Sequence, residues 1–506
     1  MRATRADVYD LQVQPTGIGV MGSVVNSGSN RKWKALALVV TAQFMVVLDL
    51  AIVNVALPSI ESDLGFSQTS LQWVITAYAI VFGGALLLGG RLADLLGRRR
   101  LFVAGLVLFT TSSLLCGLAW SAGTLIAFRA VQGLGGALLA PAALSLLMTC
   151  FAEGRERNLA LGIYGAASGS GAAVGVLLGG VLTSWLGWSW IFFINVPVGV
   201  AAIAVTPILL RESRAELAHR HFDVAGAVSI TSALMLLVYA MTRATTHGWS
   251  SAGTIGLLAL SAILVVGFVL IEQRSPSPLL PLRIFRLRTV SAANATIALI
   301  YAAAFSEFFL LTLYFQEVLH YSAIESGAAF SAFALTVVVT SNLAQAAIGR
   351  IGLRTTLTGG LLLSVLSLAL LTRLPVDGHY LTDVLPAFVI GGAGLGFSFV
   401  PLTIASLTGV DRADAGVASG LVNTSRQVGG AIGLAATSTI AAGVTNAHLR
   451  THALAESSVA LDHGFRTALY VLTGVLVAAI FVARAIPLHT SAERAEAEPA
   501  ALDEAA

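Results

Sequence analysis

Fourteen apolar runs, each about as long as a bilayer is thick, follow one another along the 506-residue chain. A helix of about 20 apolar residues crosses the hydrocarbon core of a membrane. Backbone groups in that core must be hydrogen-bonded within the protein, which favours helices. Only 11% of the residues are charged, less than half of the roughly 25% found in soluble domains. The chain is therefore predicted to be an all-α polytopic membrane protein. The runs lie at about 35–57, 71–89, 101–120, 124–148, 159–183, 190–210, 224–243, 251–271, 290–313, 327–347, 355–373, 383–407, 416–442 and 466–487.

Lysine and arginine residues gather in alternate loops between these runs. With both termini placed in the cytoplasm, 23 of the 29 basic residues fall in cytoplasmic segments, four in outer loops and two within helices. Cytoplasmic loops of membrane proteins carry such an excess of positive charge. Both termini are therefore predicted to be cytoplasmic, with residues 1–32 a disordered tail and 489–506 a second tail. Because the charge sets the orientation, we expect no nucleic-acid partner.

An internal repeat divides the chain. Gly171 and Gly175 in the fifth run have counterparts 258 residues later, at Gly429 and Gly433 in the thirteenth run. Internal repeats of this size are common in membrane transporters. The predicted domains are a six-helix half, a peripheral two-helix insert with its flanking loops, and a second six-helix half related to the first by a pseudo-twofold axis. Their bounds are 33–211, 212–289 and 290–488.

The segment GRLADLLGRRR, residues 90–100, joins the second and third runs. So short a joint between two spans must be a tight turn, and its four arginines place it in the cytoplasm. Asp94 is its only acid, and it can meet an arginine or a helix N-terminus. The pattern resembles the signature loop of the major facilitator superfamily of transporters, although an ordinary basic loop is an alternative. The resemblance implies a gate that latches the cytoplasmic side, formed by Gly90, Arg91, Asp94, Gly97, Arg98 and Arg99.

Four charged residues lie in the middle of predicted helices, where a charge is costly and often functional. They are Asp49, Arg129, Glu307 and Arg426. Two acids and two bases can form ion pairs, or they can line a wet cavity. The sequence leaves both arrangements open.

Two of these charges belong to motifs of the first half. Asp49 lies in LDLAIVNVALP with Asn54, and Arg129 lies in RAVQGLGGALLAP with Gln132. These motifs resemble those of the fourteen-helix drug:proton antiporters (EmrB/QacA type) of the superfamily. The resemblance ties Asp49 and Arg129 to proton coupling, and Asn54 and Gln132 are predicted to contact substrate. The alternative is a static ion pair between Asp49 and an arginine.

A run of small residues, GAASGSGAAVGVLLGG, occupies the fifth predicted helix. Small residues four positions apart let helices approach closely. The run resembles the antiporter motif of the family, with Val176 where a proline is usual. Generic helix packing is the alternative. The predicted packing face consists of Gly171, Gly175, Gly179 and Gly180.

The second half carries the other two charges. Arg426 lies in GVASGLVNTSRQVGGAIG with Asn423, a segment that also resembles the antiporter group, and Glu307 stands among phenylalanines. Arg426 is predicted to hold an anionic group or to pair with Glu307. Glu307 is predicted to bind a lipophilic cation, to carry a proton, or to serve as that structural partner. Asn423 and Gln316 are further predicted substrate contacts.

Some motifs are absent from the sequence. It has no G-x-x-x-x-G-K-[ST] loop for ATP and no paired-cysteine or H-E-x-x-H metal pattern. We therefore expect no cofactor, no metal and no enzymatic activity. The predicted function is proton-driven efflux of lipophilic or amphipathic compounds, including antibiotics, by a monomer in the cell membrane that exchanges a small-molecule substrate against protons. A dedicated metabolite exporter or a proton-coupled importer with the same fold is the alternative.

Overall fold

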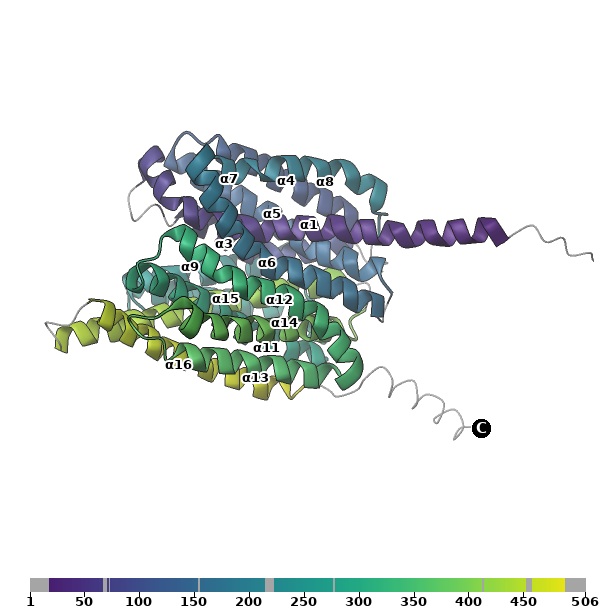
Figure 1. Ribbon diagram of the computed structural model, residues 1–506. Helices are drawn as coiled ribbons and strands as arrows, with labels where there is room; N and C mark the ends of the chain where they lie inside the picture. Colours follow the sequence, from purple (N-terminus) through teal and green to yellow (C-terminus); the bar gives the residue numbers. More distant parts are fainter. Residues whose placement is uncertain are drawn as a thin grey trace, which may run out of the picture.

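The computed structural model describes residues 18–486 except 67–70, 72, 153–154, 214–222, 276–277, 412–413 and 452–456. The described chain is built from helices (Figure 1). Their bounds are α1 Ile18–Leu64, α3 Trp73–Leu96, α4 Arg98–Gly117, α5 Ala122–Cys150, α6 Arg155–Leu186, α7 Trp190–Phe193, α8 Asn195–Leu209, α9 Val224–His247, α10 Ala252–Arg274, η1 Leu282–Arg286, α11 Arg288–Leu313, η2 Tyr314–Val318, α12 Ala323–Ile351, α13 Leu353–Leu371, η3 Tyr380–Val384, α14 Leu385–Leu407, α15 Ala415–Thr451 and α16 Ser457–Ala483.

Where the structure describes them, the predicted apolar runs lie on helices, and the run 190–210 is divided between α7 and α8 at Ile194. Among the described residues, thirteen helices are long and apolar enough to cross a membrane, and the 32-residue helix α6 covers the remaining run. The all-α prediction is confirmed, and fourteen spans agree with this arrangement. Several helices extend past their runs: α1 begins at Ile18, within the segment predicted to be a tail, and α15 continues to Thr451. Adding one residue to an existing helix is far easier than starting a new one, so a span readily continues into polar sequence. The segments 1–17 and 487–506 lie outside the described residues.

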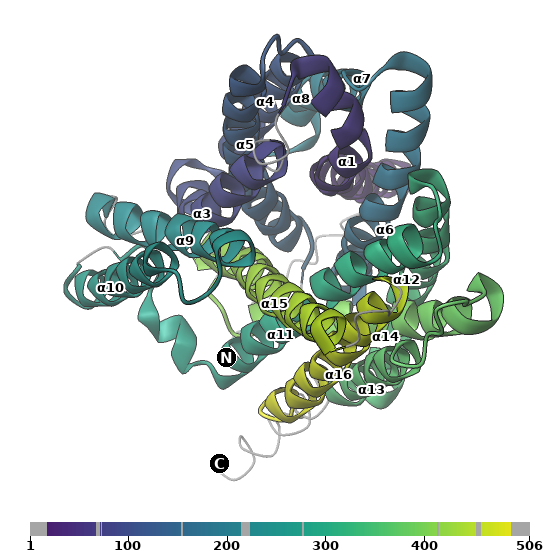
Figure 2. The same ribbon diagram turned by 90° about the vertical axis from the view of Figure 1, so that its left-hand side faces the viewer.

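The spans form two groups of six that repeat the same contacts. In the first group α1 packs on α6, α3 on α5 and α4 on α5; in the second, α11 packs on α15, α12 on α14 and α13 on α14. The groups meet chiefly through α3 with α15 and α6 with α12, and α5 also contacts α15 while α14 contacts α6. Exchanging the two groups turns the α3–α15 contact into the α6–α12 contact, as a pseudo-twofold axis requires. The groups lie side by side in Figure 2, where α9 and α10 sit at the edge.

The insert helices α9 and α10 lie against the joint between the halves. Helix α9 contacts α3 and α15, and α10 packs on α9. Gly84 on α3 makes room for this docking, because a Cβ atom there would lie 2.3 Å from the Met235 side chain. The outward face of α10 is apolar and exposed, with Ile263 and Val266 among its residues, as expected for a surface that faces lipid.

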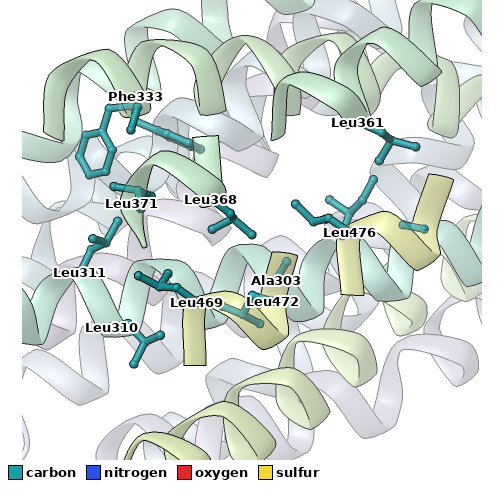
Figure 3. Packing of buried hydrophobic residues seen from close by; sticks show 14 of the residues in the cluster. Ala303, Leu310, Leu311, Phe333, Leu361, Leu368, Leu371, Leu469, Leu472 and Leu476 are labelled. Carbon is teal, nitrogen blue, oxygen red and sulfur yellow. The ribbon is translucent and has the colours of Figure 1, made fainter. Parts of the chain in front are cut away.

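Each half has its own apolar core. In the second half, leucines of α11, α13 and α16 interlock, including Leu310, Leu368 and Leu472 (Figure 3). Separate clusters fill the first half, and one of them also includes Leu407 and Ala418 of the second half. The halves are therefore two packed bodies joined along α3–α15 and α6–α12.

Ion pairs lie at both ends of the bundle, and those at one end involve the segments that the sequence predicts to be cytoplasmic. Lys32 binds Glu156 at 2.6 Å, and Arg99 lies 3.8 Å from Glu212. The exposed Trp120 and Trp185 stand at the opposite end, and tryptophans of this kind mark a membrane–water interface. The end that holds Lys32 and Arg99 is the one that the distribution of basic residues predicts to be cytoplasmic.

Candidate functional site

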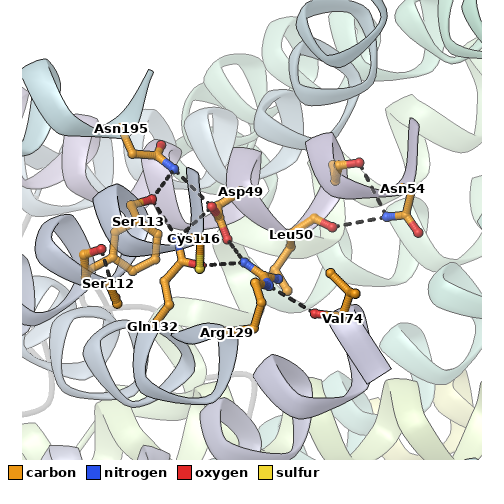
Figure 4. A network of polar contacts seen from close by, with 12 residues as sticks. Asp49, Leu50, Asn54, Val74, Ser112, Ser113, Cys116, Arg129, Gln132 and Asn195 are labelled. Carbon is orange, nitrogen blue, oxygen red and sulfur yellow. Dashed lines mark hydrogen bonds and ion pairs between the residues drawn. The ribbon is translucent and has the colours of Figure 1, made fainter. Parts of the chain in front are cut away.

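The buried carboxylate of Asp49 is the centre of a polar network within the first half (Figure 4). Arg129 Nη1 donates to Asp49 Oδ2 at 2.6 Å, while Gln132 Nε2 and Asn195 Nδ2 donate to Oδ1 at 2.8 and 2.9 Å. Ser113 Oγ accepts from the same two amides at 2.8 and 3.0 Å. Helices α1, α4, α5 and α8 thus each contribute a polar side chain to one cluster.

Arg129 is enclosed on its remaining sides. Its Nε donates to the Val74 carbonyl at 3.0 Å, and its guanidinium lies 4.3 Å from the centre of the Tyr78 ring. Asp49, Arg129 and Gln132 are all fully buried. A buried ion pair of this kind needs extra hydrogen bonds to compensate for the lost hydration, and this network supplies them. The pairing of Asp49 with an arginine, one of the two arrangements left open by the sequence, is present.

Glycines hold α6 directly against this part of α1. A Cβ atom on Gly175 would lie 2.8 Å from the Leu48 carbonyl oxygen, and one on Gly179 would lie 2.9 Å from that of Ile52. A Cβ atom on Gly171 would lie 3.0 Å from the Val47 side chain, and Gly180 is buried. The predicted packing face therefore lies against the turns of α1 that bracket Asp49.

The second half has the same close approach between α15 and α11. A Cβ atom on Gly429 would lie 2.2 Å from the Ala298 carbonyl oxygen, and one on Gly433 would lie 2.4 Å from Ala302. The repeated glycines thus make the same kind of contact in both halves.

The residues of the predicted gate lie where the halves meet at the predicted cytoplasmic end. Asp94 accepts from Arg98 Nη2 at 3.0 Å and from the backbone N–H groups of Gly416 and Val417 at 3.1 Å each. Gly90 lets α3 touch α15, because its Cβ would lie 2.4 Å from the Gly416 carbonyl oxygen. Asp94 thus meets both an arginine and a helix N-terminus.

The other predicted gate residues surround this contact. Gly97 turns the chain at a φ of +109°, a conformation that favours glycine. The Arg99 backbone N–H donates to Glu212 at 3.2 Å, and Arg91 and Arg98 are buried.

Glu307 and Arg426 are buried in the second half without a charged partner among the described residues. Glu307 is 9% exposed, and its Oε1 has no hydrogen bond. Arg426 is 7% exposed; its Nε is unbonded, and its guanidinium lies 4.7 Å from the Phe399 ring centre and 5.4 Å from that of Tyr301. No ion pair joins the two side chains, so the pairing that the sequence left open is not formed here.

The repeat explains why Glu307 lacks the partner that Asp49 has. Glu307 stands 258 residues after Asp49, on the corresponding helix. The positions 258 to 260 residues after Arg129 hold Ala387, Phe388 and Val389. The second half thus keeps an acid on its first helix but has no arginine in the helix that would face it.

The remaining predicted contacts lie apart from one another. Asn54 is exposed and donates to the Leu50 carbonyl at 3.1 Å, and Asn423 is buried and donates to the Ser419 carbonyl at 3.0 Å. Gln316 is half-buried in η2. The structure therefore does not collect all predicted substrate residues into one site. Ser113 was not predicted as a site residue, and Asn195 had no assigned role, because neither carries a charge that would mark it in a membrane helix.

Comparisons with known proteins agree with this architecture. Residues 39–434 match the family described as Major Facilitator Superfamily. The puromycin resistance protein pur8 of Streptomyces alboniger is 42% identical over 88% of this chain and 90% of its own length. The cephamycin export protein CmcT of Amycolatopsis lactamdurans is 40% identical over 90% of this chain and 95% of its own. The tetracenomycin C resistance and export protein of Streptomyces glaucescens is 35% identical over 82% of this chain and 77% of its own length. The structure of the human organic anion transporter MFSD10 superposes with a TM-score of 0.63 at 14% identity, covering 89% of this chain and 99% of that one.

Proposed function

The chain belongs to the Major Facilitator Superfamily, and from this premise we propose that it exports lipophilic or amphipathic compounds, antibiotics among them, in exchange for protons. Relatives that cover most of the chain are named for resistance to puromycin and for export of cephamycin and tetracenomycin C. These names support drug efflux as the function. The proposal also states that export is coupled to protons, and this part rests on the buried charges.

The observation that carries the coupling proposal is the contrast between the two buried acids. Asp49 accepts hydrogen bonds from three side chains, one of them a cation, whereas Glu307 has an unbonded oxygen and forms no ion pair with any cation that the structure describes. An unpaired charge in a membrane interior is costly, so a proton on Glu307 would remove that cost. We assign the exchangeable proton to Glu307. The Asp49–Arg129 pair would couple to it by holding α1, α4, α5 and α8 together as the halves move.

The contact at Asp94 suggests how the cycle is gated. The halves touch through α3–α15 and α6–α12, and Asp94 joins α3 to the start of α15. Opening toward the cytoplasm requires these hydrogen bonds to break while each half moves as a packed body. Protonation and substrate binding would shift the balance between the two arrangements.

Orientation and assembly are further parts of the proposal. The excess of basic residues in alternate loops supports a multi-pass protein in the cell membrane with both termini in the cytoplasm. A single chain contains both halves and both buried acids, which supports a monomer as the working unit.

The function is tested by puromycin accumulation in cells that produce the full chain. We expect less accumulated puromycin than in cells with an empty vector, and a protonophore should abolish the difference. Glu307→Gln should abolish it too, with the protein still present in the membrane. Lower accumulation that persists with the protonophore would refute proton coupling, and unchanged accumulation of puromycin and of a cephamycin would refute export of these compounds.

A further inference from the structure

Two pockets in the second half each contain one unpaired charge. The first is lined by Arg426 with Ile297, Tyr301 and Phe399, and the second by Glu307 with Phe333. Neither lining includes a residue of opposite charge. Both charged side chains are more than nine-tenths buried, and each has a polar atom without a hydrogen bond among the described residues.

The two pockets adjoin. Ile300 of α11 and Leu395 of α14 line both of them. Tyr301, beside Arg426, and Glu307 are six residues apart on α11, which corresponds to about 9 Å along a helix. We call this space the α11–α14 slot, defined by Ile297, Ile300, Tyr301, Glu307, Leu395 and Arg426. The slot is nearly closed in this arrangement, because the two pockets have volumes of only about 10 and 20 Å³, so a ligand would enter it as the helices move apart.

We propose that the α11–α14 slot binds amphoteric compounds, with an anionic group at Arg426, an ammonium group at Glu307 and an apolar body between Ile300 and Leu395. The inference rests on the proposed export function and specifies its substrate class. Arg426 brings a cation between two aromatic rings, a setting suited to a planar carboxylate. Glu307 brings an acid beside the ring of Phe333, a setting suited to an ammonium group.

The two side chains do not compensate each other in this arrangement, so a ligand can supply a partner for each, in place of the exchangeable proton at Glu307. A compound with both charges compensates both buried groups. A compound with one charge leaves either Arg426 or Glu307 without a partner, and a neutral compound leaves both without one. Each buried charge that gains no partner lowers the affinity for the compound. A proton on Glu307 would compete with the ammonium group. Protonation would therefore weaken binding at the Glu307 end of the slot and leave the Arg426 end unaffected.

The test measures binding of four compounds to the purified full chain in lipid nanodiscs by titration calorimetry. The parent compound is aminomethyl-biphenyl-carboxylic acid, whose amine and carboxylate stand at opposite ends of two rings. Its methyl ester keeps only the cation, its N-acetyl derivative keeps only the anion, and the doubly masked compound is neutral. We expect the parent to bind about 10- to 100-fold more tightly than either singly masked compound, the range of one charged hydrogen bond.

The variants assign the two ends of the slot. In Glu307→Gln the N-acetyl derivative should bind as tightly as the parent, while the methyl ester should still bind more weakly. In Arg426→Gln the methyl ester should bind as tightly as the parent, while the N-acetyl derivative should still bind more weakly. Asp462→Asn changes an equally buried acid on α16 that binds Arg466 at 2.9 Å outside the slot, and it should leave the ranking unchanged. Equal weakening of all four compounds by either slot variant, or equal binding of the four by the unaltered chain, overturns the inference.

A separate measurement distinguishes this failure from failure of the proposed function. The unaltered chain in proteoliposomes should transport puromycin when a proton gradient is imposed. Gradient-driven transport without any preference for the parent compound overturns the α11–α14 slot alone, whereas loss of all gradient-driven transport overturns the export proposal.

Discussion

Asp94 on α3 accepts a hydrogen bond of 3.1 Å from the backbone N–H of Gly416 on α15, so a carboxylate of one half caps a helix of the other. The free N–H groups of a first helical turn and the helix dipole both favour an anion there. The cap therefore stabilises the arrangement in which the predicted cytoplasmic ends of α3 and α15 touch.

Asp94→Asn should loosen this contact. The amide carries no charge, so the interactions with Arg98 and with the α15 N-terminus lose about 1.5–3 kcal/mol. Spin labels at Leu96 and Thr408, exposed positions in the two halves, should move apart in double electron–electron resonance. Asp462→Asn removes an ion pair with Arg466 within the second half, away from the predicted gate, and serves as the control, with no change expected. An unchanged distance distribution in Asp94→Asn would rule out the cap as a latch.

Asp49→Asn should destabilise the protein because Arg129 would remain buried without its counter-charge. Removing one partner of a buried ion pair costs about 3–5 kcal/mol, so we expect a clear drop in the thermal unfolding midpoint. The double variant Asp49→Asn with Arg129→Gln should recover much of that loss. Additive losses in the double variant would show that the two side chains do not act as a pair.

Glu307→Gln should leave the unfolding midpoint unchanged or raise it. Glutamine has the shape of a protonated glutamate and carries no charge into the pocket. Transport by the variant in proteoliposomes should also lose its dependence on the imposed proton gradient. A drop in stability as large as that of Asp49→Asn would mean that Glu307 has a cationic partner after all.

Gly175→Ala should disturb the contact between α1 and α6. The added methyl would lie 2.8 Å from the Leu48 carbonyl oxygen, and overpacking of this kind costs about 1–3 kcal/mol. The matched control is Gly267→Ala on α10, where nothing lies within 4 Å of the added Cβ. Thermal unfolding should separate the two variants, and equal midpoints would contradict the close approach.

The sequence predicted the spans well because hydropathy acts locally. The fourteen runs lie on helices where the structure describes them, and Asp94 met both of the partners expected for it. The sequence could not decide whether Glu307 pairs with Arg426, since that depends on how α11 and α15 are rotated about their axes. The sequence also could not predict that Asn195 binds Asp49. The two residues lie 146 positions apart in the chain, and only the packing of their helices brings their polar atoms to 2.9 Å.

The glycine contacts show which parts of the two halves are alike, and the buried acids show where the halves differ. Two six-helix units with the same internal contacts are the expected product of a duplicated gene. At Gly171 and Gly175, and at Gly429 and Gly433, any substitution adds atoms where backbones already touch, so neither copy can drift there. The helix facing Asp49 kept an arginine while the helix facing Glu307 has only apolar residues at the matching positions. Of two acids at matching positions of the repeat, Asp49 thus lies in an ion pair and Glu307 does not, although the glycine contacts that frame them are the same.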